Sequence, residues 1–293
     1  MNSFEKMDIT RDFIRSKRPC SNGYRWYLKR QEEVSGYQRL LDDLVLEGRV
    51  ADACWLLDQL GPTDDVLTVD EWSAEALVFA GTVVCRRSLD VDTVLRTGGA
   101  LTVMGGIRAG TLLQVGGELR TGGAVQCGGA MKVGSDARIG WSLNVAEGLT
   151  VGGGLRVGWD LFAAGQAHVE GQVNVGQGLV AEADFVCHAG MRTGADLTVA
   201  GSLDVSQGVW AAGSIRGGRH LQCGWGMLAG DDIVAEGAIR AGETLQAGGV
   251  IESGPDYGVF AGLVTPMDAW ERCAFVRASA KPARLISGCW SGA

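Results

Sequence analysis

Histidine, cysteine and paired acidic residues most often carry catalysis or bind metals, and the chain offers few groupings of them. Its three histidines, His168, His188 and His220, fall at the second, fourth and sixth positions of a six-residue repeat, so we expect no two of them to stack in one column. The sequence contains no CxxC pair, nucleophile elbow or zinc motif. We therefore expect surface histidines, no catalytic residues, no metal site and no cofactor.

Arginine and tryptophan offer a different chemistry, which is binding. Several of them recur at a spacing of eighteen residues, and in a coil of that length they stack in columns about 5 Å apart. The candidate partner-binding residues are Arg120, Arg138, Arg156, Arg192, Trp141, Trp159 and Trp210. Stacked arginines repel one another, which favours a second use for them, and guanidinium groups bind carboxylates and phosphates. We expect a docking face here.

A simpler interpretation of the arginines stays open. Exposed arginines on strands stack on aromatic rings, and corner acids such as Asp160 or Glu118 can neutralise them, which would leave a solvated ladder. On another face Phe162 and Val180 point outward one turn apart. They form a candidate secondary apolar patch.

These positions all depend on a repeat of six residues that runs without insertion or deletion from Leu77 to Ile251. The first residue of each hexad is usually large and aliphatic, and the third is small or β-branched. Alternate side chains of a strand point to opposite faces, so positions one and three face inward, position two faces outward, and the other three form a corner. The sequence therefore predicts a mainly β fold: a triangular parallel β-solenoid with eighteen residues per coil and about ten coils.

The residues at inward positions support this frame. Where the first position shrinks to Ala137, the third grows to Ile139, which conserves core volume. Cys85, Cys127, Cys187 and Cys223 all occupy the inward third position, so we expect core fillers and not disulfides or ligands.

We expect three regions: a helical N-terminal capping domain over residues 1–76, the hexad-repeat solenoid over 77–251, and a small C-terminal cap over 252–293. Leucines at helical spacing in residues 36–60, with Gly48 between two helices, predict a helical hairpin. A further helix is expected at about residues 8–18. Such caps cover strand edges that would otherwise pair with another chain.

The C-terminal cap has two predicted elements. Thr265 followed by Pro266 resembles an N-cap and a first-turn proline, which predicts a short helix through Cys273. Arg284, Leu285 and Ile286 predict a last strand.

Composition limits the class of protein. The chain has 46% hydrophobic residues and a net charge of -8, which argue for a large buried core and against general nucleic-acid affinity. No stretch reaches the roughly 20 apolar residues of a membrane helix. The charged N-terminal residues lack the apolar run of a signal peptide, so we expect a cytoplasmic location.

The hexads resemble those of two known groups. Val115-Gly116, Val133-Gly134 and Val157-Gly158 resemble the first half of the motif of hexapeptide-repeat acyltransferases, which implies a transferase activity. The repeat also looks like that of bactofilins, cytoskeletal β-solenoids with apolar-glycine repeats, which implies end-to-end assembly. The whole chain is similar in style to repeat proteins with a short helical head, some of which are thought to act as immunity partners of bacterial toxins.

Among these functions we expect a non-catalytic solenoid that binds another protein, because a rigid column presents a preorganised surface at little ordering cost. An immunity protein that neutralises a toxin domain by direct binding is the most concrete form of this expectation. A self-assembling scaffold is the alternative, and an acyltransferase comes third. We expect a monomer or small oligomer that binds neither membranes nor nucleic acid.

Overall fold

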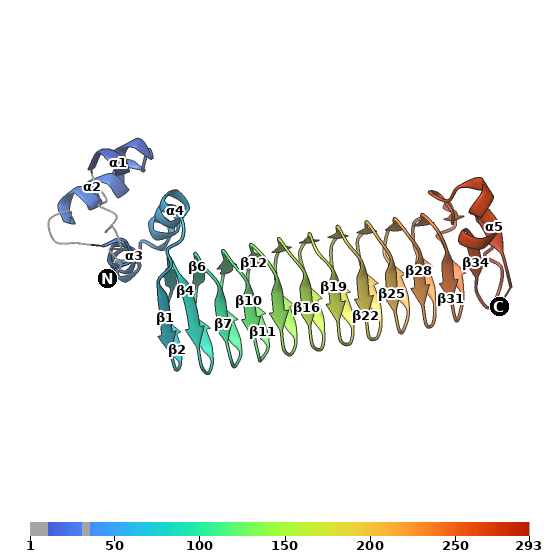
Figure 1. Cartoon of the computed structure of the whole chain (residues 1–293), viewed down its shortest axis with the longest axis horizontal. Helices are drawn as coiled ribbons and strands as arrows, with labels where there is room; N and C mark the ends of the chain where they lie inside the picture. The colour runs from blue at the N-terminus through green and yellow to red at the C-terminus, as the bar shows by residue number, and fades with distance from the viewer. Residues whose placement is uncertain (1–10, 31–35, 293) are drawn as a thin grey trace.

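The computed structural model describes residues 11–30 and 36–292, in which helices at one end lead into a long stack of short strands (Figure 1). The helices before the stack are α1 (Arg11–Ser16), α2 (Ser21–Arg30), α3 (Tyr37–Leu46) and α4 (Val50–Leu60). Two short helical segments lie near the other end, η1 (Met267–Ala269) and α5 (Trp270–Cys273). The predicted hairpin at 36–60 is confirmed as α3 and α4. The helix expected at 8–18 is α1 where the structure describes it, residues 8–10 lie outside the described residues, and the sequence did not predict α2.

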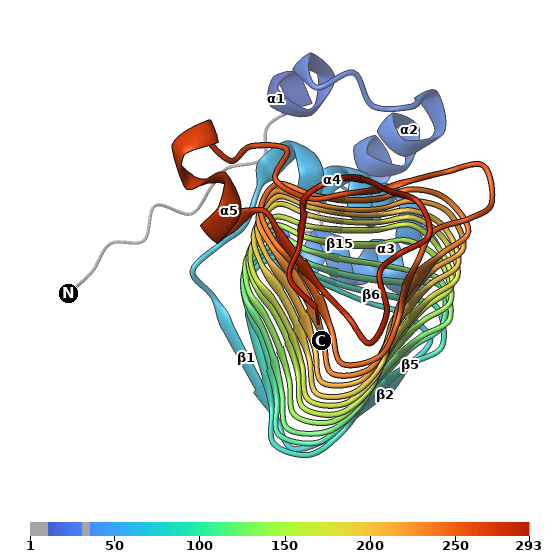
Figure 2. The same cartoon turned by 90° about the vertical axis from the view of Figure 1, so that its right-hand side faces the viewer.

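Three parallel sheets form the sides of the stack, and Figure 2 shows them end on as a three-sided coil. Sheet A contains β1 (Val66–Val69), β4 (Thr82–Cys85), β7 (Leu101–Val103), β10 (Leu119–Thr121), β13 (Ala137–Ile139), β16 (Leu155–Val157), β19 (Val173–Val175), β22 (Met191–Thr193), β25 (Val209–Ala211), β28 (Met227–Ala229), β31 (Leu245–Ala247), β34 (Phe275–Arg277) and β36 (Cys289–Trp290). Sheet B contains β2 (Trp72–Ala74), β5 (Leu89–Val91), β8 (Ile107–Ala109), β11 (Val125–Cys127), β14 (Leu143–Val145), β17 (Leu161–Ala163), β20 (Leu179–Ala181), β23 (Leu197–Val199), β26 (Ile215–Gly217), β29 (Ile233–Ala235) and β32 (Ile251–Glu252). Sheet C contains β3 (Leu77–Phe79), β6 (Val94–Thr97), β9 (Leu112–Val115), β12 (Ala130–Val133), β15 (Leu149–Val151), β18 (Ala167–Val169), β21 (Phe185–Cys187), β24 (Leu203–Val205), β27 (Leu221–Cys223), β30 (Ile239–Ala241), β33 (Val259–Phe260) and β35 (Leu285–Ser287).

The predicted triangular solenoid is confirmed, with about 12 turns where the sequence predicted about ten. In most strands the first and third residues are buried and the residue between them is more exposed, as the alternation of side chains predicts. Leu101, Leu119, Ala137 and Leu155 pair in consecutive turns of sheet A, so the inward side chains form continuous columns. All of them are at most 1% exposed. The core of the solenoid is therefore a continuous apolar column along the axis, and a separate apolar cluster lies among the helices.

The coil begins before the regular repeat. β1 and β2 precede Leu77 and pair with the following turn, but Val69 lies opposite Cys85 and Trp72 opposite Leu89. The first turn thus uses sixteen or seventeen residues where later turns use eighteen. Because its corners are shorter, the frame shifts and the six-residue period does not extend back to Val66.

The helices α3 and α4 pack on the first turns of sheet C. The side chain of Gln38 accepts a hydrogen bond from the Ala80 N–H at 2.8 Å and donates one to the Val78 carbonyl at 3.0 Å, so it pairs with the edge of β3 as a neighbouring strand would. Val78 is 1% exposed beneath these helices although it faces away from the solenoid core. Arg96 is buried beside it, where it pairs with Asp58 and donates to the Cys54 carbonyl at 2.9 Å. The helical end is therefore fixed to the solenoid by both apolar and polar contacts.

The last turns are irregular in length: Val259 pairs with Leu285, 26 residues later, whereas Phe275 pairs with Cys289, 14 residues later. Leu245 pairs with Val276, and η1 and α5 lie in the long connection between β33 and β34. The expected N-cap is wrong, because η1 begins after Pro266 and the Thr265 hydroxyl donates to the Gly242 carbonyl at 3.2 Å instead. The predicted end of the helix at Cys273 and the strand near 284–286, now β35, are confirmed. The sequence did not predict β36, which pairs with β34.

Corner glycines allow consecutive turns to approach each other closely. A Cβ atom at Gly158 would lie 2.0 Å from the carbonyl oxygen of Gly140 in the previous turn. Among the described residues, glycines with positive φ lie only outside 77–251, so close approach and not backbone conformation explains glycine in the regular corners. None of the described helices is long and apolar enough to cross a membrane.

Candidate protein-binding face

The outward residues of sheet A form one column, as the eighteen-residue spacing predicted. Strand pairing aligns them directly, each with the next residue along the axis. The column contains Thr102, Arg120, Arg138, Arg156, Asn174, Arg192, Trp210, Leu228 and Gln246. We call its arginines and Trp210, together with Trp141 and Trp159, the Arg–Trp face.

Corner acids neutralise part of the arginine ladder. Glu118 accepts from Arg120 at 2.8 Å and from Arg138 at 2.7 Å, and Asp136 pairs with Arg138 at 3.2 Å. The hydrogen bond to Glu118 raises the pKa of Arg120 above its ordinary value. The solvated-ladder interpretation was therefore right about Glu118 for these two arginines.

Arg156 differs from its neighbours in the ladder. Within the described part of the chain no ion pair involves it. Asp160, the other acid expected to neutralise the ladder, instead accepts a hydrogen bond from the Gly178 N–H at 3.0 Å. Arg156 thus presents a guanidinium that the fold leaves available to an external anion.

Exposed tryptophans lie beside this ladder. Trp141 follows β13 and Trp159 follows β16, both in the corner between sheets A and B. The backbone N–H of Trp159 donates to the backbone carbonyl of Trp141 at 3.2 Å, which confirms that the two residues lie in consecutive turns. Their exposed fractions are 62% and 53%, large values for indole side chains without an assigned contact.

The secondary apolar patch adjoins the same corner on sheet B. Phe162 pairs with Val180 across β17 and β20. Val180 is 43% exposed and Phe162 is half-buried. Because Trp159 leads directly into β17, the arginine ladder, the two tryptophans and this patch lie in a few consecutive turns around one corner.

Further along sheet A the face becomes aromatic. The guanidinium carbon of Arg192 lies 4.2 Å from the centre of the Trp210 ring, a cation–π contact. An open groove of about 580 Å³ is lined by Arg192, Trp210, Leu228, Gln246 and Trp225, among others. We call it the aromatic groove.

Sequence reasoning missed Trp225, which lies in the corner between sheets C and A and is 52% exposed. The sequence contained a signal that could have identified it: Trp225 occupies the fifth position of its hexad, the same corner position as Trp141 and Trp159. The exposed tryptophans therefore border sheet A on both sides, at different heights along the axis.

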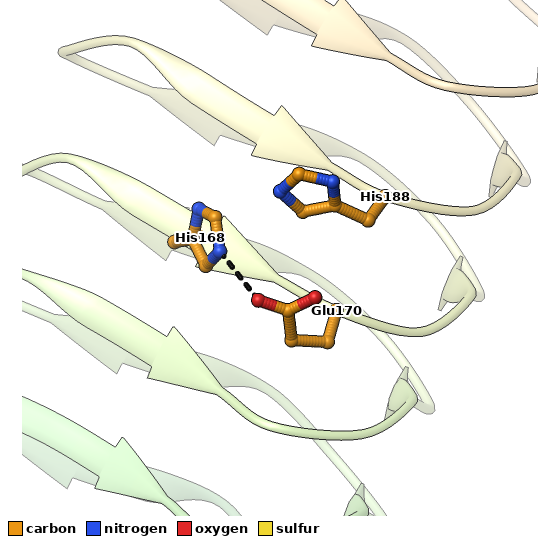
Figure 3. Close-up of side chains that lie close together, drawn as sticks. All are labelled: His168, Glu170 and His188. Atoms are coloured by element: carbon orange, nitrogen blue, oxygen red, sulfur yellow. Dashed lines mark hydrogen bonds and ion pairs between the residues drawn. The ribbon is translucent and has the colours of Figure 1, made fainter.

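As expected, no two of the three histidines share a column, but His168 and His188 of adjacent turns lie close together. His168 Nε2 lies 2.8 Å from an oxygen of Glu170, and the rings of His168 and His188 have centres 4.8 Å apart. The hydrogen bond with His168 lowers the pKa of Glu170 below its ordinary value. Columns alone do not reveal this grouping, because His168 meets His188 diagonally between adjacent turns (Figure 3). We call His168, Glu170 and His188 the histidine cluster.

The third histidine has a structural role. His220 Nδ1 accepts a hydrogen bond from the Ala238 N–H at 3.0 Å, and its ring packs edge-on against Tyr257. It therefore supports the corner of the next turn.

The cysteines behave as predicted. All eight are free, and Cys85, Cys127, Cys187 and Cys223 are buried in the core. Burial raises the pKa of the Cys127 and Cys187 thiols, and that of Cys223 to about 12. These thiols are core residues and not nucleophiles.

Comparison with known proteins gives a match only at the helical end. Residues 7–60 match the family described as the YdhT N-terminal domain, a stretch that contains α1 to α4 and none of the solenoid strands. No curated protein and no solved structure matches the chain.

Proposed function

We propose that this solenoid is a non-catalytic binding protein that docks another protein on the Arg–Trp face. The observation that carries the proposal is the grouping of Arg156, Trp141, Trp159 and the Phe162–Val180 pair around one corner. Arginine and tryptophan are among the residues most enriched in interface hot spots, and here they lie beside a small apolar pair.

The partner that fits this face is a protein with an acidic patch beside an apolar one. Carboxylates of the partner would pair with Arg156 and compete with Glu118 for Arg120 and Arg138. The sheets hold the backbone beneath these side chains at fixed spacing, so binding has to order side chains but no strand or loop. A rigid surface of this kind suits the blocking of a toxin domain, and an immunity protein is the form of the proposal that we favour.

The proposal is tested by capture followed by direct titration. The full chain and a variant with Arg120→Gln, Arg138→Gln and Arg156→Gln are immobilised and exposed to lysate of the native host. We expect a protein that the wild type retains and the variant loses. A variant with Lys132→Gln, Arg216→Gln and Arg240→Gln is the matched control, because these exposed cations lie on sheets B and C. Equal affinity of the captured protein for all three chains, measured by calorimetry, would contradict the proposal.

A self-assembling scaffold is the second candidate, and the ends of the sheets favour it. β1 and β2 are the terminal strands of sheets A and B, whereas Gln38 pairs only with β3 of sheet C. Val66 in β1 is 62% exposed. Terminal strands can pair with the end of a second column. Filaments of the purified full chain in electron micrographs would favour this candidate over the binding protein.

A further inference from the structure

The histidine cluster is a product of the coil geometry. His168 is the outward residue of β18, Glu170 follows that strand, and His188 occupies the place of Glu170 one turn later. The His188 N–H donates to the Val169 carbonyl at 2.9 Å, which fixes the two corners against each other. Figure 3 shows the three side chains gathered on the same side of two adjacent turns. The hydrogen bonds between the two turns therefore fix the Cα positions of all three residues relative to one another.

The distances within the cluster are close to those of a metal site. One nitrogen from each histidine and one oxygen of Glu170 lie within 4.8 Å of one another, and the His168–Glu170 pair is at 2.8 Å. Ligands about 2.0–2.1 Å from a tetrahedral zinc ion are roughly 3.3 Å apart. Glu170 and His188 are exposed and His168 is partly exposed, so their side chains are free to make the small rotations that this spacing requires.

The donor set selects the class of metal. Two imidazole nitrogens and one carboxylate oxygen suit zinc, cobalt or nickel, whereas calcium and magnesium prefer oxygen ligands throughout. With three ligands from the chain, a coordination position stays available for water or for a side chain of another molecule.

We propose that His168, Glu170 and His188 bind one divalent transition-metal ion of the zinc class, which links two adjacent turns on sheet C and keeps an open coordination position. His168 lies on sheet C, and Glu170 and His188 lie in the corner between sheets C and A, on the other side of sheet A from Trp141 and Trp159. The site does not depend on the proposed protein partner.

Cobalt(II) is a suitable probe because its visible absorption reports ligand type and geometry. The full chain, stripped with chelator and kept reduced, is titrated with cobalt(II) and then with zinc(II) in competition. We expect d–d bands of a nitrogen- and oxygen-ligated ion without the charge-transfer band of thiolate ligands. A variant with His168→Gln and His188→Gln should bind at least about tenfold more weakly.

Two controls separate metal binding from a general defect. His220→Gln removes the third histidine and should bind cobalt(II) as the wild type does. Glu170→Gln keeps the size of the side chain, and it should weaken binding without changing the melting temperature of the metal-free protein. Equal binding by the wild type and the double variant, or no binding by the wild type at about 100 μM metal, would overturn the proposal.

Discussion

Arg138 and Arg156 are neighbours in the same column, yet their surroundings differ. Arg138 is held between Glu118 and Asp136, while no ion pair of the described chain involves Arg156. An arginine already paired with carboxylates must exchange partners on binding, whereas an unpaired one gains a new contact. At the residue scale, a carboxylate of the partner therefore gains the most binding free energy at Arg156.

Replacing the ladder should separate stability from binding. For Arg120→Gln, Arg138→Gln and Arg156→Gln together, we expect a melting temperature within about 2 °C of the wild type, because exposed ion pairs contribute little to folding. Affinity for the partner should fall by about thirtyfold or more. Arg156→Gln alone should account for more of the loss than Arg120→Gln alone.

Charge reversal and salt provide the check on this prediction. Glu at the same three positions should weaken binding further, and the wild-type complex should loosen as ionic strength rises. Unchanged affinity in both the Gln and the Glu variants would leave the solvated ladder as the better account.

Thiol labelling tests the cysteine assignments. At pH 8 we expect a thiol reagent to modify exposed Cys20 rapidly in the native protein and to spare Cys127, Cys187 and Cys223. Burial raises the pKa of these three thiols, so the reactive thiolate is scarce until the pH approaches the raised values. Mass spectrometry should show all eight cysteines modified after unfolding, and Cys20→Ser should remove the fast phase.

At the scale of elements, the corner determines how closely turns pack. Gly158→Ala should destabilise the protein by about 1–3 kcal/mol, because its Cβ would meet the Gly140 carbonyl at 2.0 Å and the backbones would have to separate. Gly148→Ala is the matched control, since its nearest neighbour is the Gln166 carbonyl at 3.7 Å. We expect this control to change stability by less than about 0.5 kcal/mol in denaturant unfolding. Equal effects of the two substitutions would show that close approach does not explain the glycines.

The repeat predicted most of the solenoid because a strict period fixes both the direction and the neighbours of every side chain. It placed Arg120 beside Arg138 and Phe162 beside Val180 without any structure. It could not place β1 and β2, because corners shorter by a residue break the period. It also missed the histidine cluster and Trp225, because contacts along diagonals and across corners are not visible in columns of eighteen.

At the scale of the whole molecule, the two ends differ. The helical end rests on sheet C through Gln38, Asp58 and the apolar contacts around Val78. The opposite end is formed by β35 and β36 and the irregular loops that precede them, with Trp290 packed against the core. We therefore expect the contacts at each end to limit association of columns.

Removing residues 1–65 should test the role of the helical end. The deletion stops immediately before β1 and uncovers Val78 and Arg96, which α3 and α4 bury. We expect the intact chain to be a monomer or small oligomer at micromolar concentration and the truncated chain to associate. Light scattering after size exclusion measures both masses, and a truncated chain that stays monomeric would show that the helices do not protect the end.

Each regular turn pairs only with the turn before it and the turn after it, and each adds eighteen residues. The turn is in this sense a unit of length, because every eighteen codons lengthen the solenoid by about 4.8 Å along its axis. Excising the turn that contains Asn174 would leave the remaining columns in register and place Arg192 directly beside Arg156. Gain or loss of whole turns can thus change the distance between the ladder and the aromatic groove in fixed steps, while the chemistry of each side is inherited unchanged.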